Sequence, residues 1–128
     1  MSNKGTFHDL IVWQKAMSLT KVVYRTTQAF PDTEKFGLVA QMRRAAVSVA
    51  SNIAEGNARQ SLRDYLHFLG MARGSLAELE TQVIIAHDLT MVHEPKPLVE
   101  LIQETRRILQ GLMDSLRKKQ QDQQTTKE

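Results

Sequence analysis

Apolar residues recur every three or four positions over three long segments of this 128-residue chain, and no stretch of strand length alternates apolar with polar residues. The recurring positions are Val39, Met42, Ala46, Val49 and Ile53; Leu62, Tyr65, Leu69, Ala72, Leu76, Leu79, Val83 and Ala86; and Leu98, Leu101, Thr105, Ile108, Leu112 and Leu116. This spacing places each set on one side of an α-helix. Such stripes pack helices together at a shallow angle, so the chain is predicted to be all-α.

Proline and glycine divide the chain into helical segments. The predicted segments lie near residues 8–29, 34–56, 61–90 and 97–119. A proline disfavours helix in the residue before it, so Pro31 marks the first break, and Asp32 or Thr33 is expected to cap the next helix. Gly56 suits a helix C-terminus. Short connections favour an antiparallel up-down-up-down four-helix bundle.

The domain boundaries follow from composition. We expect a single four-helix-bundle domain over residues 1–119, because 128 residues are one domain's worth of chain. Residues 120–128 are rich in Gln, Lys and Thr, which predicts a disordered polar tail. Ser61 followed by Asp64 resembles a capping box at the start of the third segment.

Composition also restricts the class of protein. Charged residues make up 24% of the chain and apolar residues 41%, which is typical of a folded, soluble domain. The chain has no cysteine, which excludes disulfides, thiolate metal sites and cysteine nucleophiles. No apolar run approaches the roughly 18 residues of a membrane span, and the N-terminal residues lack the apolar stretch of a secretory signal. We therefore expect a cytoplasmic protein without a membrane partner.

The first segment carries more apolar residues than one buried stripe requires. One strip consists of Leu10, Trp13, Met17 and Tyr24, and a second strip beside it of Val12, Ala16, Leu19 and Val23. A helix at the corner of a monomeric bundle needs a single stripe. The surplus predicts contact with another copy of the chain, with the second strip as the candidate interface. The alternative is a helix wedged more deeply into its own bundle.

Small residues line one flank of the third segment, at Gly70, Gly74, Ala77 and Thr81. Glycine inside a helix costs about 0.8–1.0 kcal/mol relative to alanine, so Gly70 and Gly74 require a reason. Close approach of another helix, within or between subunits, is the interpretation that we favour, and both glycines are candidate interface residues. The alternative interpretation is a ligand that contacts the exposed helix backbone at these glycines.

Positive charge is concentrated in the middle of the chain. Residues 40–75 have a net charge of +3 and residues 76–116 a net charge of −4. All basic side chains of the middle segment are arginines, namely Arg43, Arg44, Arg59, Arg63 and Arg73. Arginine matches phosphate geometry well, so these five residues are candidates for a nucleic-acid-binding face. The same charges are equally suited to salt bridges within or between subunits, or to a solvated surface.

Short polar side chains accompany these arginines on the second segment. Ser48 and Asn52 follow Arg44 at successive i,i+4 positions, opposite the apolar stripe. A solvated helix face more usually carries Glu, Lys and Gln, because Ser and Asn are mediocre helix formers. The pattern indicates a face contacted by a phosphate backbone or by a neighbouring subunit. Ser48 and Asn52 are therefore added to the binding candidates.

Catalytic and metal-binding chemistry is not indicated. The histidines show no zinc spacing, and Asp64 with His67 is a single carboxylate–imidazole pair where a di-iron bundle needs two Glu-x-x-His pairs. Phosphate loops and nucleophile elbows are missing from the sequence. We therefore predict no enzyme activity, no metal and no cofactor.

Blocks of sequence in a definite order resemble one small bacterial family. They are FHDLIVWQKA at 7–16, QMRRAAVS at 41–48, NIAEG at 52–56 followed by Arg59, YLHFL at 65–69 and ARGSLAEL at 72–79. Together they are similar to the 23S ribosomal RNA intervening-sequence protein family, also called the four-helix-bundle protein family, over about residues 7–116. More distantly, the chain is similar to the accessory variability protein of diversity-generating retroelements.

The resemblance implies an up-down four-helix bundle and a homopentameric ring. The family's name reflects genes inside inserted segments of large-subunit ribosomal RNA, and the retroelement protein is a basic pentamer that engages nucleic acid and a reverse transcriptase. We expect a non-enzymatic homo-oligomer that binds structured RNA or DNA through its arginines. The alternative is a scaffold that binds a protein partner and uses its arginines in subunit contacts.

Overall fold

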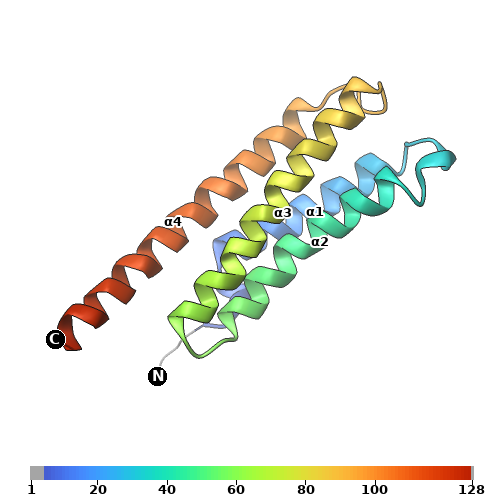
Figure 1. Ribbon diagram of the computed structural model, residues 1–128. Coiled ribbons are helices and arrows are strands. Elements are labelled where there is room, and N and C mark those ends of the chain that lie inside the picture. Colours follow the sequence, from blue (N-terminus) through green and yellow to red (C-terminus); the bar gives the residue numbers. More distant parts are fainter. Residues whose placement is uncertain (1–4, 128) are drawn as a thin grey trace.

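Four long antiparallel helices make up residues 5–127, the part of the chain that the computed structural model describes (Figure 1). The helices are α1 (Ile11–Thr27), α2 (Leu38–Asn57), α3 (Leu62–Asp88) and α4 (Lys96–Lys127), and the 3₁₀ turns are η1 (Phe7–Asp9) and η2 (Asp32–Glu34). Each helix packs against the helices before and after it in the chain, and α4 also packs against α1. The predicted up-down-up-down bundle is therefore confirmed, and no strand occurs in residues 5–127.

The core confirms the predicted stripe of α2 and most of that of α3. In α2 all five predicted positions are buried, and in α3 the stripe is buried from Leu69 to Ala86. In α4 the stripe is partly wrong, because Leu101, Ile108 and Leu112 are only half-buried. The buried positions of α4 are Leu98, Ile102, Thr105, Leu109, Met113 and Leu116. Two adjacent apolar strips run along α4, and only its contact with α1 and α3 decides which one is innermost.

An aromatic cluster holds the N-terminal end of α1. The predicted helix began near residue 8, but α1 begins at Ile11 because Leu10 has an extended backbone. The ring of Trp13 lies 5.2 Å from that of Phe7 and 5.3 Å from that of His8. Aromatic pairs at this separation are stabilising, so the segment before α1 is packed against the helix.

The ends of α2 differ from the prediction. Asp32 and Thr33 lie in η2 and do not cap α2, whose N-cap is Gly37 without a side-chain hydrogen bond. Gly56 does not end the helix in a left-handed conformation, because α2 continues through it to Asn57 and positive-φ glycines are absent from residues 5–127. At the start of α3 the capping prediction is confirmed, since Ser61 Oγ accepts a hydrogen bond from the Asp64 amide at 3.1 Å.

The last helix continues beyond the predicted domain end. We expected the helix to stop near residue 119, but α4 runs to Lys127, and the side chains of residues 121–125 are exposed. The sequence after Gly111 contains no proline or glycine, and its Gln and Lys residues are good helix formers. The disorder of residues 120–128 in solution stays a prediction; residues 1–4 and 128 lie outside the described range.

The turn after α3 contains a strained residue. Thr90 has a φ of 61°, and the amides of Thr90 and Met91 donate to the carbonyls of His87 and Ala86 at 2.9 and 2.8 Å. This is a Schellman motif, in which glycine normally occupies the left-handed position. A β-branched residue in this conformation costs on the order of 1–2 kcal/mol relative to glycine. Part of this difference is offset, because glycine loses more conformational entropy on folding.

Replacing Thr90 with glycine is therefore expected to raise the free energy of unfolding by about 0.5–1 kcal/mol. Urea denaturation at a fixed protein concentration measures this change. The control is Thr81→Gly, at an exposed position inside α3, which should lower stability by a few tenths of a kcal/mol. A destabilised Thr90→Gly variant contradicts the assignment of strain to this residue.

Candidate functional site

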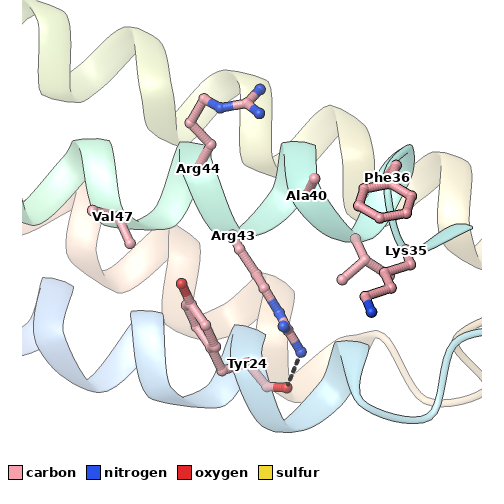
Figure 2. Close-up of a pocket in the computed structure, with 8 residues that line it drawn as sticks. Tyr24, Lys35, Phe36, Ala40, Arg43, Arg44 and Val47 are labelled. Atoms are coloured by element: carbon pink, nitrogen blue, oxygen red, sulfur yellow. Dashed lines mark hydrogen bonds between the residues drawn. The ribbon is translucent and has the colours of Figure 1, made fainter.

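A shallow depression lies where the first half of α2 passes the end of α1 (Figure 2). Its volume is about 490 Å³. Its walls are formed by Tyr24, Lys35, Phe36, Val39, Ala40, Arg43, Arg44 and Val47. Its lining is mostly apolar and includes three basic side chains, a composition that suits a ligand or partner with apolar groups and negative charge.

Large apolar side chains around this depression are open to solvent. Phe36 is 88% exposed, and Val47 and Tyr24 are each about two-fifths exposed. We name Lys35, Phe36, Ala40, Arg44 and Val47 the α2 surface. Sequence reasoning missed Phe36 and Val47. Two signals were visible: Phe36 is an aromatic residue in a polar loop directly before Gly37, and Val47 lies outside the apolar stripe of its helix.

Arg43 joins α2 to α1. Its Nε donates to Thr27 Oγ1 at 2.9 Å and one terminal nitrogen donates to the Tyr24 carbonyl at 3.3 Å. The guanidinium also lies 4.5 Å from the centre of the Tyr24 ring. Figure 2 shows Arg43 reaching across to α1 while Arg44 points away from it. Arg43 is thus engaged in holding two helices together.

The predicted arginine cluster is dispersed. Arg59 pairs with Glu55 at 3.1 Å and stacks 4.7 Å from the Phe68 ring centre, and Arg73 donates to Gln110 of α4 at 2.9 Å. Arg44 and Arg63 make no hydrogen bond or ion pair with the described residues. At a rise of 1.5 Å per residue, α2 extends about 20 Å from Arg44 to its last residue, Asn57, and Arg59 lies beyond that end. The five arginines therefore do not form one continuous face.

Ser48 and Asn52 lie in the seam between α2 and α3. The hydroxyl of Ser48 is 2.9 Å from that of Ser75, and Asn52 Nδ2 donates to the Ser48 carbonyl and hydroxyl at 2.8 and 2.9 Å. Both side chains are half-buried. Their hydrogen bonds are made within the chain, which explains the short polar residues without an external ligand.

A second groove follows this seam. It is lined by Gln41, Arg44, Ala45, Ser48 and Glu78 and has a volume of about 280 Å³. Gln82, one turn after Glu78, is 5% exposed, and its side-chain oxygen has no hydrogen-bond partner among the described residues. The groove places the unpaired Arg44 and the exposed Glu78 on one side of the molecule.

The interface candidates of α1 require a correction. Val12, Ala16, Leu19 and Val23 are at most 2% exposed, because they form the side of α1 that packs into the chain's own core. These four side chains therefore offer no exposed surface that a second copy of the chain could contact. The outer strip is the other one, since Leu10, Trp13 and Met17 are half-buried and Tyr24 is exposed. The sequence contained both strips, and only the packing of α2 and α4 on α1 distinguishes them.

Gly70 and Gly74 lie on the outward face of α3. A Cβ built on either glycine meets no atom within 4 Å, so no helix of this chain approaches them closely. The close approach that the sequence analysis predicted is thus not made within the chain. Contact with a neighbouring subunit stays a prediction for these two residues.

The second half of α3 carries an acidic surface with exposed apolar residues. We name Glu78, Ile84, Ile85 and Asp88 the α3 surface. Ile84 and Ile85 are 51% and 42% exposed, and Glu78 and Asp88 make no ion pair with the described residues. The sequence signal was four consecutive apolar residues at 83–86, of which only Val83 and Ala86 belong to the core stripe.

The titratable groups that the structure describes form no metal-binding cluster. Asp64 and His67 are both exposed, and no group of three or more His, Cys, Asp or Glu residues in residues 5–127 is arranged to hold a metal ion. Burial raises the pKa of Tyr65, an effect opposed by a 3.2 Å hydrogen bond from Asn57 Nδ2. Within the described range, no helix has the length and apolarity needed to cross a membrane.

Comparison with known proteins connects this fold to one family. A family model described as 23S rRNA-intervening sequence protein matches residues 8–112. The fold is similar to a crystal structure from Bacteroides thetaiotaomicron, of a protein of unknown function in the S23 ribosomal protein family, with a TM-score of 0.75. The two chains are 17% identical, and the alignment covers 81% of this chain and 96% of that one. No curated protein matches this sequence.

Proposed function

Since the chain belongs to the 23S rRNA-intervening sequence protein family, we propose that it is a non-enzymatic homo-oligomeric bundle that acts as a binding scaffold. A pentameric ring is the assembly that the sequence resemblance implies. The observation that carries the proposal is the distribution of large exposed apolar side chains. They lie on α1, in the α1–α2 loop, on α2, along α3 and directly after it, whereas the described side chains of α4 contribute none. Grouped apolar side chains, such as Tyr24, Phe36 and Val47 around the depression, are typical of interaction sites, so α4 would face solvent in the assembly.

The contacts of the arginines also favour a scaffold. Arg43, Arg59 and Arg73 bind partners within the chain, which leaves fewer of them to contact phosphates than the sequence indicated. A guanidinium that already donates to a neighbour in the chain has fewer N–H donors left for a phosphate. Structural use of these three residues is therefore the simpler interpretation.

Size-exclusion chromatography with light scattering tests the assembly. We expect a molar mass several times the 14.6 kDa of one chain, and unchanged across a wide range of protein concentration. A mass of one chain at all concentrations contradicts the proposed function. The cytoplasm is the proposed location, which fractionation of the native host's cells tests.

Nucleic-acid binding is the second candidate function, and the unpaired guanidinium of Arg63 is the observation that favours it. Arg63 lies in the first turn of α3, beside the capped helix N-terminus, where positive potential accumulates. The family's description refers to an intervening sequence of 23S rRNA, so structured RNA is the first ligand to test.

Labelled structured RNA titrated at about 50 and 200 mM salt should then bind with an affinity that falls steeply as salt rises. Arg63→Gln should weaken binding and reduce the slope of log K against log salt by about one. Arg117→Gln is the matched control, because Arg117 already pairs with Asp114. Binding that is absent at both salt concentrations contradicts this function and leaves the scaffold alone.

A further inference from the structure

The opposite charges of the two halves of the chain are not neutralised inside it. The ion pairs between helices in the described residues are Lys15–Glu104 and Arg106–Glu80. Neither involves an arginine of the middle segment, and the one middle-segment pair, Arg59–Glu55, stays within that segment. The basic α2 surface and the acidic α3 surface therefore both present unpaired charge, together with exposed apolar side chains.

The two surfaces lie at the same height on the bundle. Ser48 of α2 hydrogen-bonds to Ser75 of α3, so these two residues define the register of the antiparallel pair. Counting one residue forward in α3 for each residue back in α2 places Arg44 level with Leu79, and Phe36 level with His87. Figure 1 shows the start of α2 and the end of α3 at the same end of the molecule.

Equal height has a consequence for assembly. A rotation about an axis that runs along the helices brings the α2 surface of one copy to the α3 surface of the next, with no shift along the axis. This rotation places Arg44 opposite the neighbour's Glu78, and Phe36 opposite its Ile84 and Ile85. A contact between two different surfaces by pure rotation generates a closed ring, whereas a shift would generate a filament.

We propose that the α2 surface of each copy packs against the α3 surface of a neighbouring copy, with Arg44 and Glu78 paired across the interface. This inference rests on the proposed homo-oligomer and identifies the surfaces that build it. Opposite charges select the partner surface, and the exposed apolar side chains supply the buried area. Gly70 and Gly74, on the same helix as the α3 surface, leave room for the neighbour's helix to approach.

Charge reversal tests the interface. We expect Arg44→Glu alone and Glu78→Arg alone to reduce the mass in light scattering to that of one chain, because each variant places like charges face to face. In the double variant Arg44→Glu/Glu78→Arg every interface again pairs opposite charges, whatever the number of chains in the ring, so the wild-type mass should be restored. The matched controls are Arg107→Glu and Glu100→Arg on α4, both exposed and without a partner among the described residues.

The outcomes separate this inference from the proposed function. A monomeric wild-type protein overturns the proposed oligomer itself. A wild-type oligomer whose mass is unchanged by either reversal, or a double variant that stays monomeric, overturns the assignment of these two surfaces. Circular dichroism of each variant establishes that the bundle is folded, and the control variants should keep the wild-type mass.

Discussion

Replacing Gly56 with alanine is expected to lower the free energy of unfolding by about 1–3 kcal/mol. Gly56 is buried where α2 meets the start of α3. A Cβ at this position would lie 2.9 Å from the Cβ of Phe68 and 3.2 Å from the carbonyl oxygen of Tyr65. Neither atom moves with a side-chain rotation, so the two helices must separate to admit the methyl group.

Gly111→Ala is the matched control for this measurement. Gly111 also lies inside a helix, but it is exposed, and a Cβ there meets nothing within 4 Å. Alanine is the better helix former by about 0.8–1.0 kcal/mol, so Gly111→Ala should stabilise the bundle. Urea denaturation of both variants at one protein concentration should give changes of opposite sign. If Gly56→Ala is also stabilising, the close packing of α2 on α3 at Gly56 is wrong.

Replacing Phe36 with serine is expected to dissociate the oligomer while leaving the bundle folded. Phe36 is 88% exposed within the chain, so its removal should change the stability of the isolated bundle by no more than about 0.5 kcal/mol. In the proposed assembly the same ring is covered by a neighbouring copy, and aromatic anchors of this kind supply much of an interface's binding energy. Sedimentation velocity should show the mass of a single chain.

Ile11→Ser is the control for this prediction. Ile11 is 62% exposed and begins α1, whereas Phe36 lies in the loop that follows the other end of this helix. This variant should keep the wild-type mass. A Phe36→Ser protein that sediments like the wild type, or an Ile11→Ser protein that dissociates, contradicts the location of the interface.

The binding candidates show where sequence reasoning reached its limit. Periodicity placed Ser48 and Asn52 on a helix face that something contacts, and charge made Arg43 a binding candidate. The structure is compatible with a contact at each of the three. The contacting groups belong to α1 and α3 of the same chain. A sequence pattern specifies the side of a helix on which a residue lies, but it does not specify which other helix passes that side.

The number of helices, their order and most of their buried positions were determined by the sequence alone. Apolar residues at helical spacing lie on one side of a helix, and burying that side against the other helices removes all of them from water. Only the tertiary structure decided which strip of α1 faces the core, why residue 56 is glycine and which arginines are already engaged. Each of these depends on the distance between side chains far apart in the chain. That distance is determined by how the helices pack. The spacing of residues within one helix does not specify which residues of another helix lie next to it.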